Sequence, residues 1–238
     1  MTWIFVEELA EDVVTVSDSE AHHLLHVLRA NCGNELTLFD GNGNSAAAVI
    51  TAMDRRTVQC TIRQFYPSTT ASSATLCVAV SPPKGDRLRW LVEKLTEIGV
   101  DSVLLMQTQR TIVNPREAKL DKLRQTVIAA CKQSQRPRLM QIEPLRSFDE
   151  IITASAHSAT QLVIAHPYAS VTPPTEEAVE QQICVMIGPE GGFTDAEVER
   201  AISAGALPAA WTSGILRTET AAIVFASMLL QKLRSADG

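Results

Sequence analysis

Several common signatures are absent from this sequence, and each absence argues against a class of function. No apolar run approaches the roughly 20 residues that are needed to span a bilayer. The start, Met1–Ile4, lacks the basic residues and long apolar stretch of a secretory signal. No G-x-x-x-x-G-K-[ST] motif is present for P-loop hydrolysis of a nucleoside triphosphate, and no G-x-G-x-x-G opens a βαβ unit. We therefore expect a cytoplasmic protein without membrane contact.

Cysteine is scarce and scattered. The chain has five cysteines, an odd number, with no C-x-x-C pair: Cys32, Cys60, Cys77, Cys131 and Cys184. This pattern predicts reduced thiols that are buried as small apolar residues. His22 and His26 share a helical face, as two zinc ligands would, but no third ligand group is identifiable. We therefore expect no metal site.

A surplus of positive charge, common in nucleic-acid-binding proteins, is also missing, since the net charge is −6. The charge is uneven, however, because residues 82–138 carry 12 basic and 6 acidic side chains while both flanks are acidic. Charge alone leaves two interpretations open. The middle block either forms a phosphate-facing patch or is a solvated helix face with mixed charges.

The most informative features present are two glycine-bearing turns, Ile187–Thr194 and Ser213–Thr220. Each follows a predicted strand and precedes a helical pattern. Each would therefore expose backbone beyond the carboxyl ends of the strands, where open α/β sheets bind ligands. Gly191 and Gly192 tolerate positive φ and let a ligand approach the main chain. A plain strand–helix connector with a glycine bend is the alternative for the first turn.

The first 65 residues are typical of short strands joined by turns. Strands are expected at 13–16, 35–39, 46–50 and 57–62, with a hairpin turn over Asp40–Asn44. A short helix is expected from 19 to 29, with Ser19 as a possible cap. So many short strands predict a small barrel. The small polar segment 67–73 is predicted to be a linker.

From Thr75 onward, strand and helix patterns alternate, which predicts an α/β fold with a mostly parallel sheet. Strands are expected at 76–80, 103–106, 162–165 and 183–187, and helices at 84–98, 117–134, 175–181, 194–204 and 218–234. Thr194 and Glu197 fit a capping box at the start of one of these helices. The apolar stretch 221–230 is explained by core burial plus a homodimer interface.

The two turns, Ile-Gly-Pro-Glu-Gly-Gly-Phe-Thr and Ile-Leu-Arg-Thr-Glu-Thr-Ala, resemble those of the bacterial 16S ribosomal RNA (uracil-N3)-methyltransferases of the SPOUT superfamily. The segments His22–Arg29, Phe39–Gly43 and Glu93–Val100 also resemble that family. One departure stands at Trp211-Thr212-Ser213-Gly214, where the family usually has Leu-Gly-x-Arg. This departure bears on the shape of the loop and on cofactor affinity.

The resemblance implies a PUA-like RNA-binding β-barrel over residues 1–70 and a trefoil-knotted SPOUT methyltransferase domain over residues 75–238, working as a homodimer. It implies S-adenosyl-L-methionine as methyl donor. The positions that match the family's cofactor loops are Ala165, His166, Ile187, Gly188, Pro189, Glu190, Gly191, Gly192, Trp211, Ile215, Leu216 and Thr220. The implied partner is 16S ribosomal RNA or the small ribosomal subunit, and the candidates for phosphate contacts are Arg29, Lys84, Arg87, Lys94, Arg110 and Arg136.

Methylation of uridine at N3 removes a weakly acidic ring proton, so the base becomes anion-like as the methyl group arrives. Arg217 is the candidate to stabilise that negative charge. The alternative role for Arg217 is structural: it would form a salt bridge to Glu219 or to an acidic group across a dimer. Glu190 is the second catalytic candidate, either as proton acceptor or as a residue that holds its loop through backbone N–H groups. His166 is a weaker candidate, and its alternative role is to line a cofactor loop.

Two alternatives to uridine N3 methylation stay open. One is a SPOUT enzyme with another RNA target, such as a ribose 2′-hydroxyl. The other is a non-catalytic RNA-binding or ribosome-assembly protein. This alternative rests on the altered loop at 211–214, which departs from the family's pattern.

Overall fold

The computed structural model describes residues 2–9, 12–68, 74–113, 117–155, 158–167, 169, 182–211 and 214–236. The chain divides into two compact units, one formed by residues 1–71 with 128–139 and the other by residues 72–127 with 140–238. Segment 128–139, expected within the second domain, thus groups with the first unit. The predicted helix at 175–181 and most of the predicted linker at 67–73 lie outside the described residues.

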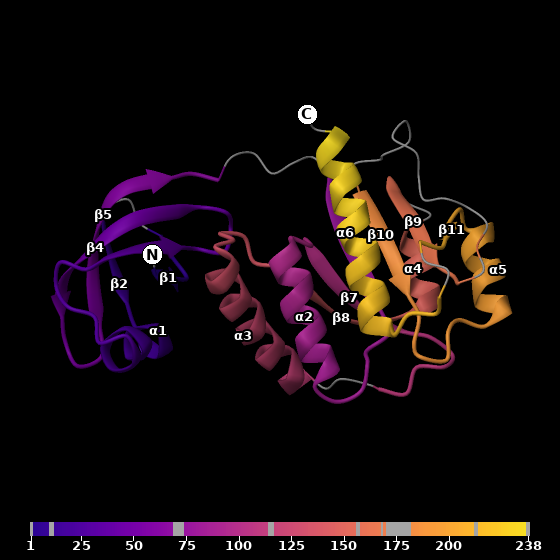
Figure 1. Ribbon diagram of the computed structural model, residues 1–238, viewed down its shortest axis with the longest axis horizontal. Coiled ribbons are helices and arrows are strands. Elements are labelled where there is room, and N and C mark those ends of the chain that lie inside the picture. The colour runs from indigo at the N-terminus through magenta and orange to yellow at the C-terminus, as the bar shows by residue number, and fades with distance from the viewer. Residues whose placement is uncertain are drawn as a thin grey trace. The chain divides into compact units, whose positions relative to one another are not determined.

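The first unit is built on a curled five-stranded sheet of order β1-β3-β4-β5-β2 (Figure 1). β1 and β3 run parallel, and the other neighbours are antiparallel. Two register shifts between β4 and β5 interrupt their pairing, and such irregularities bend a sheet. The four expected strands are present and β1 is additional: β1 (Thr2–Phe5), β2 (Val13–Val16), β3 (Glu35–Phe39), β4 (Ser45–Met53) and β5 (Val58–Tyr66).

The helix expected at 19–29 is shorter than predicted and changes its geometry. α1 (Asp18–His22) is followed by a π-helical turn, η1 (His23–Val27). The expectation of a cap at Ser19 was wrong, because Ser19 lies inside α1 and Ser17 stands at the N-cap position. Ser17 makes no side-chain cap hydrogen bond, since its hydroxyl donates to the carboxylate of Asp18 at 2.8 Å instead.

The hairpin turn predicted over Asp40–Asn44 is confirmed. The carboxylate of Asp40 accepts hydrogen bonds from the backbone N–H of Asn42 at 2.7 Å and of Asn44 at 3.2 Å. Gly41 has a φ of +78°, and a Cβ there would lie 2.7 Å from the side chain of Leu139. The N–H of Leu139 donates to the carbonyl of Gly41 at 2.9 Å. This close contact explains why segment 128–139 belongs to the first unit.

The second unit contains a six-stranded parallel sheet of order β11-β9-β10-β6-β7-β8. Its strands are β6 (Thr75–Val80), β7 (Ser102–Gln107), β8 (Gln141–Ser147), β9 (Thr160–Ala165), β10 (Gln182–Ile187) and β11 (Leu207–Ala209). Its helices are α2 (Arg87–Ile98), α4 (Phe148–Ser155), α5 (Asp195–Ser203) and α6 (Thr218–Ala236), while α3 (Glu117–Ser134) belongs to this unit up to residue 127 and to the first unit from residue 128. The predicted parallel α/β fold is confirmed, while β8, α4 and β11 were not predicted.

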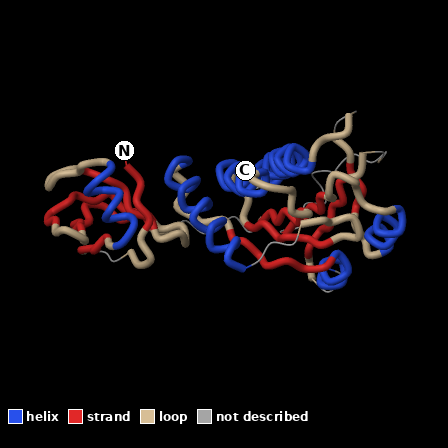
Figure 2. The backbone as a smooth tube through the Cα atoms, turned by 90° about the horizontal axis from the view of Figure 1, so that it is seen from below, coloured by secondary structure: helices blue, strands red, loops and turns tan. Residues whose placement is uncertain are grey.

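Helices cover both faces of this sheet (Figures 1 and 2). α2 and α6 pack against each other on one face, and α4 and α5 lie on the other. Strand residues such as Ala79, Leu104 and Met186 share a core with Phe148 and Phe193 on the α4–α5 side. The described helices include none that is both long and apolar enough to cross a membrane. The strand order places the carboxyl ends of β6, β10, β9 and β11 side by side.

All five cysteines are free thiols, but the expectation that all are buried was wrong, because Cys32 lies exposed in the loop before β3. Cys60 is fully buried in β5, and this burial raises the pKa of its thiol to about 11. We therefore expect iodoacetamide at about pH 8 to label Cys32 and spare Cys60 in the native protein, since the thiolate is the reactive form. Mass spectrometry of peptides checks this.

The raised pKa of Cys60 also has a consequence for stability. Burial disfavours the charged thiolate of Cys60, which is better solvated in the unfolded chain. The stability that the neutral thiol contributes to the folded protein is therefore fully present below the ordinary thiol pKa and is lost as the pH rises toward about 11. Unfolding in urea should make Cys60 and Cys32 label equally. Equal labelling in the native protein would contradict the burial of Cys60.

Candidate functional site

A cavity of about 400 Å³ opens in the second unit, where the carboxyl ends of β9, β10 and β11 lie together. Its volume falls within the range of small-molecule sites, about 300–1,000 Å³. Both glycine-bearing turns line it, although they lie far apart in the sequence. The hydroxyl of Thr218, at the start of α6, donates to the carbonyl of Gly188 at 3.1 Å and so joins the two turns directly. The position is the one where parallel α/β sheets bind ligands.

The first turn is tightly built around its glycines. A Cβ on Gly188 would lie 3.1 Å from the ring of Phe193 and 3.3 Å from its backbone nitrogen, closer than a side chain usually comes. Gly192 has a φ of +70°, which favours glycine, and its N–H donates to the carbonyl of Pro189 at 2.8 Å. The backbone between these residues therefore stays open to the cavity.

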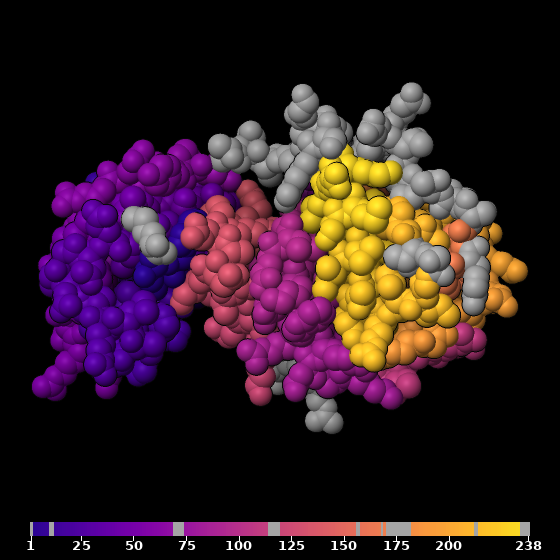
Figure 3. Space-filling model, in the orientation of Figure 1, coloured from indigo at the N-terminus to yellow at the C-terminus, as the bar shows by residue number. Residues whose placement is uncertain are grey.

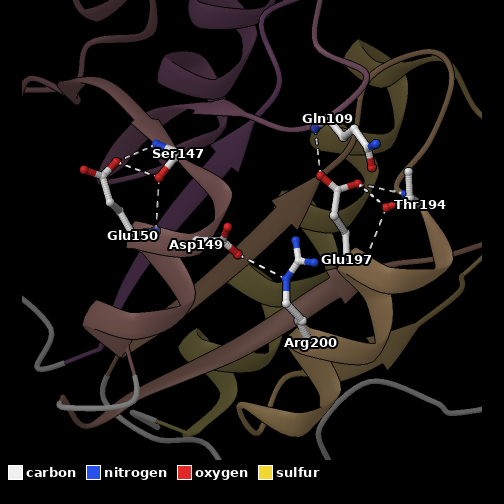
Figure 4. Close-up of polar contacts among 7 residues, drawn as sticks. All are labelled: Gln109, Ser147, Asp149, Glu150, Thr194, Glu197 and Arg200. Atoms are coloured by element: carbon white, nitrogen blue, oxygen red, sulfur yellow. Dashed lines mark hydrogen bonds and ion pairs between the residues drawn. The ribbon is translucent and has the colours of Figure 1, made fainter.

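The turn ends in the predicted capping box, which the structure confirms (Figure 4). The buried carboxylate of Glu197 accepts hydrogen bonds from the N–H and the hydroxyl of Thr194, at 2.8 and 3.0 Å. Its other oxygen accepts from the N–H of Gln109 at 2.8 Å. Glu197 thus fixes both the start of α5 and the segment that follows β7.

Two arginines from distant segments hold the tip of the same turn. Arg87, the first residue of α2, donates to Glu190 at 2.8 Å and lies 3.7 Å from Glu219 of α6. Arg110 donates to the carbonyl of Gly191 at 2.6 Å. One oxygen of Glu219 is buried without a hydrogen-bond partner in the described structure, so Arg87 provides its compensating charge. The contact between Arg87 and Glu190 fits the interpretation of Glu190 as a residue that holds its loop.

Apolar side chains form much of the rest of the cavity wall. The rings of Trp211 and Phe225 pack with centroids 4.3 Å apart, and Ile187 and Leu216 line the cavity as well. Every residue expected to bind the cofactor lines the cavity except Thr220, which lies exposed on α6. The lining residues among them are Ala165, His166, Ile187, Gly188, Pro189, Glu190, Gly191, Gly192, Trp211, Ile215 and Leu216.

Arg217 stands between two lining residues, Leu216 and Thr218, but its own side chain is exposed and outside the lining. The salt bridge to Glu219 that was its structural alternative is not formed, because Glu219 faces Arg87. Within the described part of the chain, no carboxylate lies within salt-bridge distance of Arg217.

Some lining residues escaped the sequence analysis. Thr218, Ala221 and Phe225 recur at helical spacing on α6, so a single face of this helix meets the cavity. Their spacing in the predicted helix could have indicated from the sequence that they share one helix face. Ala209 and Ala210 lie at the end of the three-residue strand β11, which is too short to give a pattern.

The other residues expected to meet phosphate are spread over both units. Arg29 and Lys84 are exposed, whereas Arg136 is half-buried. Lys94 lies between two carboxylates, 2.7 Å from Glu97 and 2.9 Å from Glu93, and these neighbours raise the pKa of its ammonium group. Its charge is therefore largely compensated within α2.

The two histidines with zinc-ligand spacing lie side by side on the first helical segment. The rings of His22 and His26 lie 4.7 Å apart, centroid to centroid. Across the described residues, no group of three or more His, Cys, Asp or Glu side chains is arranged to hold a metal ion.

Fold and cavity together define a parallel α/β protein with a small-molecule pocket lined by two hydrogen-bonded turns. The chain belongs to the RNA methyltransferase family, since the family's domain profile matches residues 70–230. The profile of an RNA methyltransferase PUA domain matches residues 16–63. The expected fold class, a SPOUT-type α/β domain with a small PUA-like β domain, is thereby confirmed.

Named relatives agree with this assignment. The chain is 29% identical over 221 residues to the ribosomal RNA small subunit methyltransferase E of Bacillus subtilis, covering 87% of this chain and 85% of that protein. The crystal structure of the Neisseria gonorrhoeae enzyme of the same name, bound to S-adenosyl methionine, superposes with a TM-score of 0.88 at 28% identity, covering 97% of both chains. A Legionella pneumophila protein, solved in complex with the same cofactor, superposes with a TM-score of 0.81 at 26% identity, covering 97% of this chain and 96% of that one.

Proposed function

We propose that this chain transfers a methyl group from S-adenosylmethionine to N3 of a uridine in 16S ribosomal RNA of the small subunit. The observation that carries the proposal is the cavity that both glycine-bearing turns line. Two solved relatives hold S-adenosylmethionine, and the Bacillus relative is named for the small-subunit ribosomal RNA. The choice of uridine N3 rests on the resemblance of the two turns.

The residues present fit this cofactor. A nucleoside ligand needs backbone donors and acceptors for its base and apolar walls around it, and Gly188–Gly192 with Ile187 and Leu216 provide both. Close packing of Gly188 on Phe193 keeps side chains away from that backbone. When bound, the cofactor supplies an electrophilic methyl group on a sulfonium.

The chain's own part in the reaction is to orient the uracil and to stabilise its negative charge. Uracil N3 loses its proton as the methyl group arrives, and the negative charge is shared between N3 and the two exocyclic carbonyl oxygens beside it. Arg217 is the proposed cation at this point, because it stands between two lining residues and is exposed toward solvent. Glu190, engaged by Arg87, is assigned to holding its loop.

RNA docking is assigned to the domain of residues 1–70, and catalysis to the domain of residues 75–238. The exposed Arg29 and Lys84 are the proposed phosphate contacts, with Arg136. We further propose that the chain works as a homodimer in the cytoplasm.

Analysis of the methylated product tests the proposal most directly. Unmodified small-subunit ribosomal RNA, free and within assembled subunits, is incubated with the chain and S-adenosylmethionine and then digested to nucleosides. We expect 3-methyluridine. A 2′-O-methylated nucleoside would move the proposal to a ribose target. Absence of cofactor binding in calorimetry would favour a non-catalytic RNA-binding protein.

Salt dependence tests the phosphate contacts. If Arg29, Lys84 and Arg136 meet phosphates, the logarithm of RNA affinity should fall linearly with the logarithm of salt concentration. Each charge removed should reduce the slope by about one, as filter binding or fluorescence anisotropy can measure. A flat response would contradict electrostatic docking.

A further inference from the structure

We propose that Arg87 and Arg110 are positioning residues, an arginine brace that holds the Gly188–Phe193 turn in its cofactor-binding shape. The inference rests on the proposed function, since it concerns the same cavity. It gives both side chains a role other than the phosphate contacts that their charge suggests.

The first half of the brace connects three segments. Arg87 donates to Glu190 at the tip of the turn, at 2.8 Å, and faces Glu219 on α6 at 3.7 Å. Its Nε also donates to the carbonyl of Lys84 at 3.4 Å. α2 and α6, which present these groups, lie side by side on the face that Figure 3 displays. The guanidinium is thus committed to protein partners on several sides.

The buried oxygen of Glu219 strengthens this assignment. Among the described residues, Oε2 of Glu219 is buried without a hydrogen bond, which is costly, while Oε1 of the same carboxylate lies 3.7 Å from Arg87; the positive charge of Arg87 therefore compensates this carboxylate. A phosphate that drew Arg87 away would leave Glu219 uncompensated in its buried position. Phosphate binding by Arg87 would therefore destabilise the contacts that hold the turn and α6 at the cavity.

The second half of the brace acts on the backbone. Arg110 donates to the carbonyl of Gly191 at 2.6 Å, with a longer contact to that of Phe193 at 3.4 Å. Its stem would lie 3.4 Å from a Cβ on Gly191. Next to it, the N–H of Gln109 is held by Glu197. Arg110 therefore approaches the turn on a fixed segment.

The brace should affect binding much more than stability. The side chains of Arg87 and Glu190 are 38% and 42% exposed, and ion pairs this exposed contribute little to folding stability. A glycine-rich turn released from its contacts, however, must be ordered again each time the cofactor binds. That ordering reduces affinity.

The test measures cofactor affinity in variants of the full-length chain. Calorimetry with S-adenosylmethionine should show about tenfold weaker binding for Arg87→Ala and for Arg110→Met, with melting temperatures nearly unchanged. Arg87→Lys should restore binding only in part, because an ammonium lacks the planar fork that reaches two carboxylates. At saturating cofactor, kcat should stay within about threefold of the wild type, so the effect appears in KM for the cofactor.

Glu190→Ala and the double variant with Arg87→Ala identify the partner. If the two side chains act together, the double variant should bind hardly more weakly than either single variant. Arg89→Ala, at an exposed arginine on the same helix, is the matched control and should leave cofactor affinity unchanged.

The phosphate interpretation predicts a different result. Arg87→Ala would then raise KM for RNA and reduce the salt slope while cofactor affinity stayed at the wild-type value, and this outcome overturns the brace. Direct contact of Glu190 with the cofactor would weaken binding in Glu190→Ala alone, which also overturns it. A wild-type chain that binds no S-adenosylmethionine refutes the proposed function itself.

Discussion

Replacing Arg217 with alanine should slow methyl transfer by about 30- to 1,000-fold, a loss on the order of 2–4 kcal/mol in the transition state. Arg217 directly precedes α6, where the helix dipole makes a cation slightly unfavourable. It is exposed, and Glu219, the carboxylate nearest in sequence, is engaged by Arg87. Since no carboxylate among the described residues lies within salt-bridge distance of Arg217, its positive charge beside the cavity is suited to a negative charge that develops only during the reaction.

Single-turnover methylation at saturating cofactor isolates this effect from binding. The affinity for S-adenosylmethionine should be nearly unchanged, because the Arg217 side chain lies outside the cavity lining. Arg217→Lys should recover part of the rate. Arg200→Ala is the matched control, since Arg200 is an exposed arginine on α5 paired with Asp149 at 3.1 Å. A wild-type rate in Arg217→Ala would remove Arg217 from the mechanism.

The fold was largely predictable because its strands are apolar and its helices periodic. Strand β10 is a continuous apolar run, as a strand covered on both faces should be, and α3 spans the range that its pattern predicts. β8 and α4 were missed for opposite reasons. β8 is partly exposed and contains Pro144, whereas α4 has only eight residues, too few for a clear helical period.

The site was predictable where it depends on local backbone chemistry. The capping box and the glycine turn are encoded within a few residues, and the structure places both beside the cavity. The contact between Arg87 and Glu190 joins residues 103 positions apart, so nothing local indicates it. Charge counting assigned Arg87 and Arg110 to phosphate because it registers the charge of a side chain and not its partner. The structure supplies the partners.

The second large effect expected is on stability, at Glu197. Glu197 is 2% exposed, and its carboxylate accepts hydrogen bonds from the backbone N–H groups of Thr194 and Gln109 and from the Thr194 hydroxyl. Glu197→Ala leaves these part-buried donors without their acceptor and removes the capping box. The expected loss is about 2–4 kcal/mol in the free energy of unfolding, from the unmet hydrogen bonds and the lost cap.

Urea denaturation, followed by circular dichroism, measures this loss. Glu199→Ala is the matched control, because Glu199 is exposed on the same helix and its loss should stay within about 0.5 kcal/mol. Glu197→Gln should fall between the two, since an amide keeps one acceptor oxygen but not both. Because Glu197 joins α5 to the segment that carries Arg110, Glu197→Ala should also weaken cofactor binding under conditions where the protein remains folded. If Glu197→Ala unfolded at the same urea concentration as Glu199→Ala, the hydrogen bonds that the Glu197 carboxylate accepts from Thr194 and Gln109 (Figure 4) would contribute little to stability, and the start of α5 would depend on core packing alone.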